Sequence, residues 1–294
     1  MIRVLDEAWG VLPTGLREWD SVDGSPVYSS LDLQNKYVEA ISNQKILSPV
    51  IKAIKAHVTN GRIIPCFANK NMMGLLFHKM FANSIDKATM GYYHPGNNKV
   101  YIIMDNRTKY LVWMSNQKLS TVTIHEMMHY AAKNYKRMFF NQFKDILGAF
   151  YSDFFSTLSG HAISPSTGSK AALYLLENFE WKQATTQSIF NYAHHLDEIV
   201  SIEIPDKDER EKFIISLISP AKIFMNDPNV FIKSLQRDDE IVNYVRGLYT
   251  SYKRLGIKSP DTTPIQEILF PSEVVAITSE RPTRKHYVAV NTVR

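Results

Sequence analysis

The feature that most constrains the fold is a pair of histidines four residues apart, with a glutamate directly after the first. The sequence reads His125-Glu126-Met127-Met128-His129, an H-E-x-x-H pattern. Residues four positions apart lie on one face of an α-helix, so a helix would bring the two imidazoles together. Two imidazole nitrogens at this spacing suit a zinc ion, and the adjacent glutamate is placed to act as a base. The sequence therefore predicts a helix with a metal site at residues 125–129.

The residues around this motif favour a helix that packs against a core. Ser120 is a suitable N-cap for it. Apolar side chains recur at spacings of four, three, four and three, namely Ile124, Met128, Ala131, Tyr135 and Met138. The competing interpretation is an ordinary amphipathic helix on which two histidines and a glutamate fall at this spacing by chance.

Composition places the chain among globular proteins and limits its partners. Of the 294 residues, 45% are hydrophobic and 12% aromatic, which is enough for one large core or two smaller ones. There are 34 Lys and Arg against 29 Asp and Glu, without a long block of like charge, so nucleic acid is not indicated as a partner. Cys66 is the single cysteine, which excludes an internal disulfide and a zinc site built mainly on cysteines.

The sequence gives no sign of a membrane partner or of export. No run of about 18 apolar residues occurs. The residues from Met1 to Glu7 lack the basic segment and apolar run of a signal peptide. We therefore expect a soluble, cytoplasmic protein.

Short helices and strands are expected before the motif. Residues 1–30 are acidic and show no helical period, so we expect an N-terminal arm. A merely packed arm is favoured over one that wraps over the body or contacts a partner. Helices are expected at 31–41, 49–58 and 71–81, and a strand at 62–68.

A β-hairpin is expected next. Residues 90–94 and 99–104 have strand character, and Pro95 followed by Gly96 suits a type II turn between them. Residues 105–117 then connect the hairpin to the helix that carries the motif.

This order of a hairpin with an edge strand, a connector and an H-E-x-x-H helix resembles the core of the zincin metallopeptidases, of the compact gluzincin or SprT-like kind. The run from Thr123 to His129 is similar to that of small zincins from phage and bacterial genomes. The resemblance covers residues 60–205. It implies an α+β fold, a mainly helical zincin-like domain with a small sheet or hairpin before the motif helix. It also implies an edge strand that lies over the metal and binds an extended substrate by strand addition.

A zincin site needs a third protein ligand. The metzincin pattern would place glycine at 132 and histidine at 135, but Ala132 and Tyr135 stand there, which excludes that subclass. An SprT-like site takes a later histidine followed by glycine and an aromatic residue. His161 is followed by Ala162 and Ile163, so it fits this pattern poorly.

Gluzincins use a glutamate on a downstream helix, commonly with a small residue three positions later. Glu198 and Ser201 have this form, on a helix expected at 188–202. Glu198 lies on the polar side of that helix, which would suit a metal cleft or bulk solvent equally. Glu180 lies among apolar residues, where a metal would offset the cost of a buried carboxylate. We expect Glu198 as the third ligand, and the alternatives are Glu180, Glu177 and His161.

The remaining chain is expected to add helices and then an extended tail. Residues 143–158 are strongly apolar and aromatic and predict a buried helix. A solvated charge run at 206–212 leads into 213–218. Further helices are expected at 231–235 and 241–255, and β-prone pieces at 273–277 and 287–290. We expect an N-terminal arm with a first helix at 1–45, a zincin-like domain at 46–258 and a basic extended tail at 259–294.

The resemblance implies a zinc-dependent metallopeptidase that acts on peptide or protein substrates. Zn²⁺ would be held by His125, His129 and Glu198, with Glu126 as the general base. An additional oxyanion donor is expected among four residues, His194, His195, Tyr174 and Tyr192.

The alternative is a structural or assembly protein, for example a phage virion component, that retains a zincin-like fold with little or no peptidase activity. It would contact other subunits through its two arms. A phage-encoded chain would lie in the host cytoplasm and the virion. A DNA-associated protease of the SprT-like type is a third possibility, against which the modest charge argues.

Overall fold

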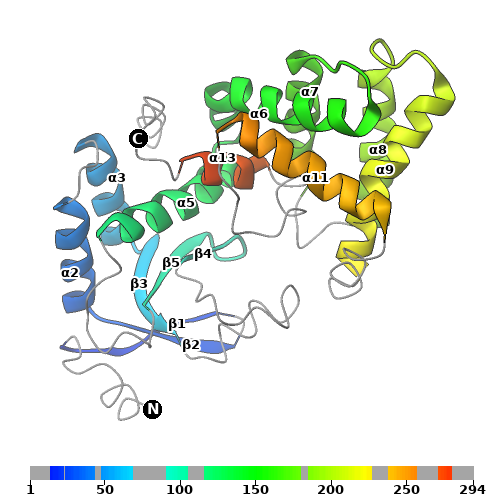
Figure 1. Cartoon of the computed structure of the whole chain (residues 1–294). Coiled ribbons are helices and arrows are strands. Elements are labelled where there is room, and N and C mark those ends of the chain that lie inside the picture. The colour runs from blue at the N-terminus through cyan, green and yellow to red at the C-terminus, as the bar shows by residue number, and fades with distance from the viewer. Residues whose placement is uncertain are drawn as a thin grey trace. The chain divides into compact units, whose positions relative to one another are not determined.

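The computed structural model describes residues 14–22, 24–43, 48–68, 91–104, 116–179, 185–226, 238–256 and 271–279. These residues divide into two units: one runs to Ala131 and includes Ser279, and the other runs from Ala132 to Thr278. The described part is mainly helical with one small mixed sheet, which confirms the α+β class (Figure 1). The three-part division expected from the sequence is a separate prediction that these units do not test. The helices expected at 71–81 and 231–235, and the strand expected at 287–290, lie outside the described residues.

A five-stranded sheet in the order β1-β2-β3-β5-β4 forms the centre of the first unit. β3 and β5 are parallel, and the other neighbouring strands are antiparallel. The strands are β1 (Arg17–Val22), β2 (Ser25–Ser29), β3 (Ile63–Ala68), β4 (Gly91–His94) and β5 (Lys99–Met104). β1 and β2 come from the segment expected to be an arm, so its described part extends the sheet instead.

The expected hairpin of β4 and β5 is confirmed, but the expected turn type is wrong. A type II turn needs a positive φ at Gly96. The positive φ occurs instead at Asn98, where it is 58°. The Nδ1 atom of His94 accepts hydrogen bonds from the backbone N–H groups of Gly96 and Asn97, at 3.1 and 3.2 Å. The imidazole therefore organises a different turn.

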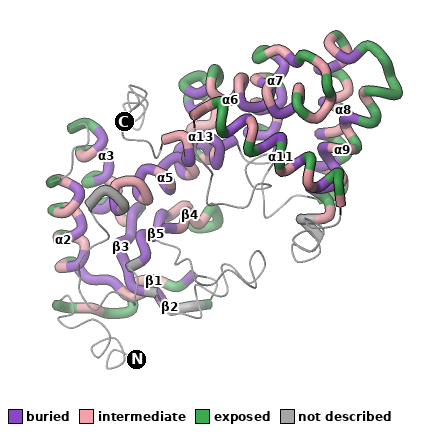
Figure 2. Tube along the Cα trace, in the orientation of Figure 1, coloured by how far each residue is buried: buried purple, intermediate pink, exposed green. Residues whose placement is uncertain are grey.

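Buried side chains and two helices pack on the sheet of the first unit. On one face lies a buried cluster with Trp19 and Tyr92 packed against it; its members are Val22, Val27, Ile64, Cys66, Tyr101 and Ile103. The helices α2 (Leu31–Ser42) and α3 (Ser48–Thr59) pack against each other and against β3. Figure 2 shows β3 and β5 as largely buried. These two helices and both central strands agree with the sequence prediction.

Helix α5 (Asn116–Asn134) carries the H-E-x-x-H residues, as predicted. It begins before Ser120, so the expected N-cap at that residue is wrong. The helix ends at Asn134, and the next residue, Tyr135, has a φ of −134° and a ψ of 44° that break the helical path before α6 begins. Because of this break, the apolar stripe does not continue, and Met138 is 47% exposed.

The described second unit consists of helices. They are α6 (Lys136–Ser159), α7 (Pro165–Asn178), α8 (Thr186–Val200), α9 (Lys207–Asn226), α11 (Asp239–Arg254) and α13 (Pro271–Ser279). The aromatic residues of α6 that are fully buried are Phe150, Tyr151, Phe154 and Phe155. This confirms the buried helix expected at 143–158.

α6 and α7 approach closely at two glycines. A Cβ atom on Gly168 would lie 2.3 Å from the carbonyl oxygen of Gly148 and 2.7 Å from the backbone nitrogen of Ser152. Real Cβ atoms do not come this near to backbone atoms, so the approach depends on the missing side chain.

The expected strand at 273–277 is wrong, because these residues lie in α13. Val274, Val275 and Ile277 are β-branched, which favours strands when propensity alone is considered. Each of them is buried in the structure, together with Ala276. A short helix whose apolar residues are buried together is stabilised by that burial, and here burial overrides propensity.

Candidate metal centre

The two histidines of the motif converge on one side of α5. The Nε2 atoms of His125 and His129 lie 3.1 Å apart, and the ring centroids lie 4.9 Å apart. Both side chains are half-buried. The arrangement follows directly from the four-residue spacing within one helix.

The side chain of Glu126, which extends from α5, lies against the start of β4. It is 8% exposed, which is unusual for a carboxylate. The backbone of Gly91 lies directly against it, since a Cβ atom at position 91 would be 2.6 Å from Cγ and 2.9 Å from Oε1 of Glu126. The first residue of β4 therefore forms a wall beside the carboxylate expected to act as a base.

Side chains of the first unit hold α5 in place on either side of the motif. The hydroxyl groups of Tyr37 and Thr123 are hydrogen-bonded at 2.8 Å in a buried position. Thr123 also donates to the carbonyl oxygen of Leu119, one turn earlier. After the motif, the ring of Tyr130 meets His57 of α3 edge to face, at 5.3 Å between centroids. The motif is thus fixed from α2 and α3.

A third potential ligand, Glu273, lies in the first turn of α13 and is 8% exposed. Its carboxylate is of a type that suits the same metal ion as the two imidazoles. The sequence reasoning did not consider it because the surrounding residues suggested a strand.

The donor set fits zinc. A tetrahedral zinc with Zn–N bonds of about 2.0–2.1 Å separates two nitrogen ligands by about 3.3 Å. The observed separation of the two Nε2 atoms is 3.1 Å. Two imidazoles and a carboxylate are also a ligand set that leaves a fourth position for water or substrate.

The expected third ligand, Glu198, is an exposed residue of α8. Its side chain is 62% exposed, and one carboxylate oxygen lies 3.4 Å from Nδ1 of His194 on the same helix. The polar side of α8 therefore faces solvent at this residue.

Two of the alternative ligands make other contacts, and the third cannot be placed. A carboxylate oxygen of Glu177 lies 3.8 Å from Nε of Arg137. His161 lies with its Nε2 atom 3.1 Å from a carboxylate oxygen of Glu209. Glu180 lies outside the described residues.

Three of the four expected oxyanion donors, Tyr174, Tyr192 and His195, form a stacked cluster between α7 and α8. The ring of Tyr174 stacks on His195 at 4.3 Å and on Tyr192 at 5.9 Å. Among the described residues, the buried hydroxyl of Tyr192 and Nε2 of His195 have no hydrogen-bond partner. Burial lowers the pKa of His195 below its ordinary value of 6.5 and raises that of Tyr192. A role for any of the four in oxyanion stabilisation stays a prediction.

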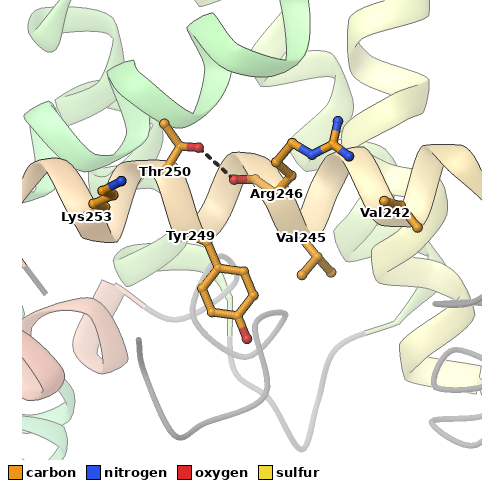
Figure 3. Close-up of a pocket in the computed structure, with 6 residues that line it drawn as sticks. All are labelled: Val242, Val245, Arg246, Tyr249, Thr250 and Lys253. Carbon is orange, nitrogen blue, oxygen red and sulfur yellow. Dashed lines mark hydrogen bonds between the residues drawn. The ribbon is translucent and has the colours of Figure 1, made fainter. Parts of the chain in front are cut away.

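A hollow of about 360 Å³ runs along the surface of α11 (Figure 3). Its lining residues are Val242, Val245, Arg246, Tyr249, Thr250 and Lys253. They all come from one helix, and they include none of the ligand types that a zinc site needs. The α11 hollow is therefore not a second candidate metal centre.

Comparison of the chain with protein-family models, with curated proteins and with solved structures gives no significant match. Within the described residues, no helix is long and apolar enough to cross a membrane.

Proposed function

We propose that this protein is a zinc-dependent metallopeptidase in which His125, His129 and Glu273 hold the ion and Glu126 is the general base. The observation that carries the proposal is the geometry within α5. Two imidazole nitrogens lie 3.1 Å apart, and a buried carboxylate follows the first of them in the chain. The combination supports hydrolysis because two of the three proposed metal ligands and the proton acceptor come from one rigid helix.

Glu273 takes the place of Glu198 in this proposal for two reasons. A buried side chain is held in one orientation by the residues packed around it, as a metal ligand must be, whereas an exposed one is free to move. Glu273 is 8% exposed, and the Glu198 side chain is 62% exposed. Glu273 also has a small residue, Ala276, three positions later, which is the spacing expected for a gluzincin glutamate.

The chemistry follows from the residue types. When bound, zinc supplies a Lewis acid that polarises a peptide carbonyl and lowers the pKa of water. The Glu126 carboxylate accepts a proton from the attacking water and then gives it to the nitrogen of the leaving amine. The peptide C–N bond breaks as the new C–O bond is completed, so the carboxylate ends the cycle as it began.

Strand addition at β4 is the proposed mode of substrate binding. Among the described strands, β4 pairs on one side only, with β5. An extended peptide that paired with its other side would run past Gly91, whose backbone lies against Glu126. Main-chain hydrogen bonds to β4 would favour unfolded or extended substrates over folded ones.

The Glu126→Gln variant tests the proposed reaction. The amide keeps the size of the side chain but cannot accept the proton, so cleavage of an unfolded protein should fall at least about 100-fold. Zinc content should remain that of the wild type, because Glu126 is not a proposed ligand. Glu39→Gln, an exposed glutamate of α2, is the matched control and should leave cleavage unchanged.

Two outcomes would contradict the proposal. Unchanged cleavage by Glu126→Gln would remove this residue as the base. A wild-type protein that binds zinc but cuts no unfolded protein would favour the alternative of a structural or assembly role.

A further inference from the structure

We infer that Gly91 is a positioning residue for Glu126, and that a side chain at position 91 would displace the carboxylate from its working position. The inference rests on the proposed function, since it assigns a role within the same site. It is carried by one close approach between β4 and α5. A Cβ atom at position 91 would lie 2.6 Å from Cγ and 2.9 Å from Oε1 of Glu126.

Glycine is needed at position 91 because a side chain would not fit there, and not because the backbone has an unusual conformation. The φ of Gly91 is not positive, so other amino acids can adopt its backbone conformation. The same Cβ atom would also lie 2.6 Å from Cγ1 of Val122, one turn before Glu126. Both contacts are well below an ordinary van der Waals separation.

Neither β4 nor α5 can easily move away from the other, because the backbone of each is held by other contacts. Gly91 is paired with Ile102 of β5 in the antiparallel ladder. On α5, Thr123 is fixed by its hydrogen bond to Tyr37. Since both backbones are held, the Glu126 side chain is the part that would have to move.

The displacement would affect the chemical step more than substrate binding. A carboxylate displaced by about 1 Å loses its alignment with the proton that it must accept, and such displacements cost up to about 100-fold in rate. The outer edge of β4, where the substrate is proposed to pair, would keep its main-chain groups. We therefore expect a lower kcat with little change in KM.

Kinetics of Gly91→Ala provide the test. With unfolded protein as the probe substrate, kcat should fall at least about 10-fold while KM stays within about 3-fold and zinc content is unchanged. Gly96→Ala is the matched control in the same hairpin, because a Cβ atom there would meet only the ring of His94. It should retain the wild-type kcat.

A double variant separates the two contacts of the new methyl group. In Gly91→Ala/Val122→Ala the contact with Val122 is relieved and the contact with Glu126 remains, so kcat should stay low. Recovery of kcat in this variant would overturn the inference, because the effect would then come from packing against Val122. An increase in KM at unchanged kcat would also overturn it, because the strand would then have moved instead of the carboxylate.

Thermal unfolding tests the contact independently of activity. In a Val122→Ala background, Gly91→Ala should lower Tm by a few degrees, and this decrease should shrink when Glu126 is also replaced by alanine. An equal decrease in both backgrounds would overturn the inference. If the coupling is present and the wild type cuts nothing, the proposed function fails while the contact stands.

Discussion

Substitution of Gly168 by alanine should destabilise the second unit, because α6 and α7 touch through their backbones at this point. The nearest atom to the new methyl group would be the carbonyl oxygen of Gly148, at 2.3 Å. An ordinary contact begins at 3.4 Å, so the helices must separate by about 1.1 Å, the difference between these two distances. Overpacking of this kind costs about 1–3 kcal/mol, and the upper end applies because backbone atoms cannot rotate away.

The helix propensity of alanine offsets part of this cost. Alanine in place of glycine stabilises a helix interior by about 1 kcal/mol. The free energy of unfolding should therefore fall by about 2 kcal/mol in Gly168→Ala, the difference between the two contributions.

Two other helical glycines provide graded controls. A Cβ atom on Gly148 would meet the movable hydroxyl of Ser169 and one backbone oxygen, that of Pro165 at 2.7 Å. A Cβ atom on Gly247 of α11 would come no nearer than 3.2 Å to the ring of Phe154. Gly148→Ala should be intermediate, and Gly247→Ala should be neutral or stabilising by up to about 1 kcal/mol.

Urea denaturation followed by circular dichroism would measure the three free energies of unfolding. A Gly168→Ala protein at least as stable as the wild type would refute the close approach of α6 and α7. An inverted order of the three variants would refute the argument from interatomic distance.

Two further predictions concern pH and helix capping. The pKa of His57 is lowered from its ordinary value of 6.5 by burial and secondarily by Arg62, so its stabilising contribution is present above pH 6.5 and is lost as the pH falls through the lowered value. His57→Gln should therefore reduce the loss of unfolding free energy between about pH 7 and about pH 5, and an unchanged slope would argue against burial of the neutral ring. The Ser164 side chain accepts a hydrogen bond from the backbone N–H of Thr167 at the start of α7, so Ser164→Ala should cost about 1 kcal/mol in urea denaturation. Ser164→Asp should restore most of the loss, and a failure to do so would indicate that the hydroxyl acts elsewhere.

Elements with strong periodicity or clear turn residues could be predicted from the sequence. The motif helix, the helices α2, α3, α8 and α11 and the hairpin all follow from local patterns. The convergence of His125 and His129 also followed, because it requires only the geometry of one helix.

The N-terminal strands and the turn of the hairpin depend on contacts that local patterns do not reveal. β1 and β2 are stabilised by pairing with each other and, for β2, with β3, which lies more than 30 residues later. The turn after β4 is set by His94, whose ring accepts hydrogen bonds from two backbone N–H groups. Neither interaction has a signature in the spacing of apolar residues.

Glu273 was not considered from the sequence for a related reason. Its neighbours Val274 and Val275 favour strands, and only their burial in the folded protein makes a helix there stable. A local signal did exist: Pro271 at the first helical position and Glu273 in the first turn are typical of a helix N-terminus. Combined with Ala276 three positions after the glutamate, that signal could have identified the residue as a ligand candidate.

Metal analysis of three proteins tests the proposed zinc centre most directly. We predict one zinc per chain in the wild type, the same content in Glu198→Gln, and at least about 10-fold weaker zinc binding in Glu273→Gln, since removal of a protein ligand weakens a three-ligand site. Wild-type zinc affinity in Glu273→Gln, or loss of zinc in Glu198→Gln, would contradict the assignment of Glu273. A wild-type protein that binds no zinc would contradict the proposed metal centre itself.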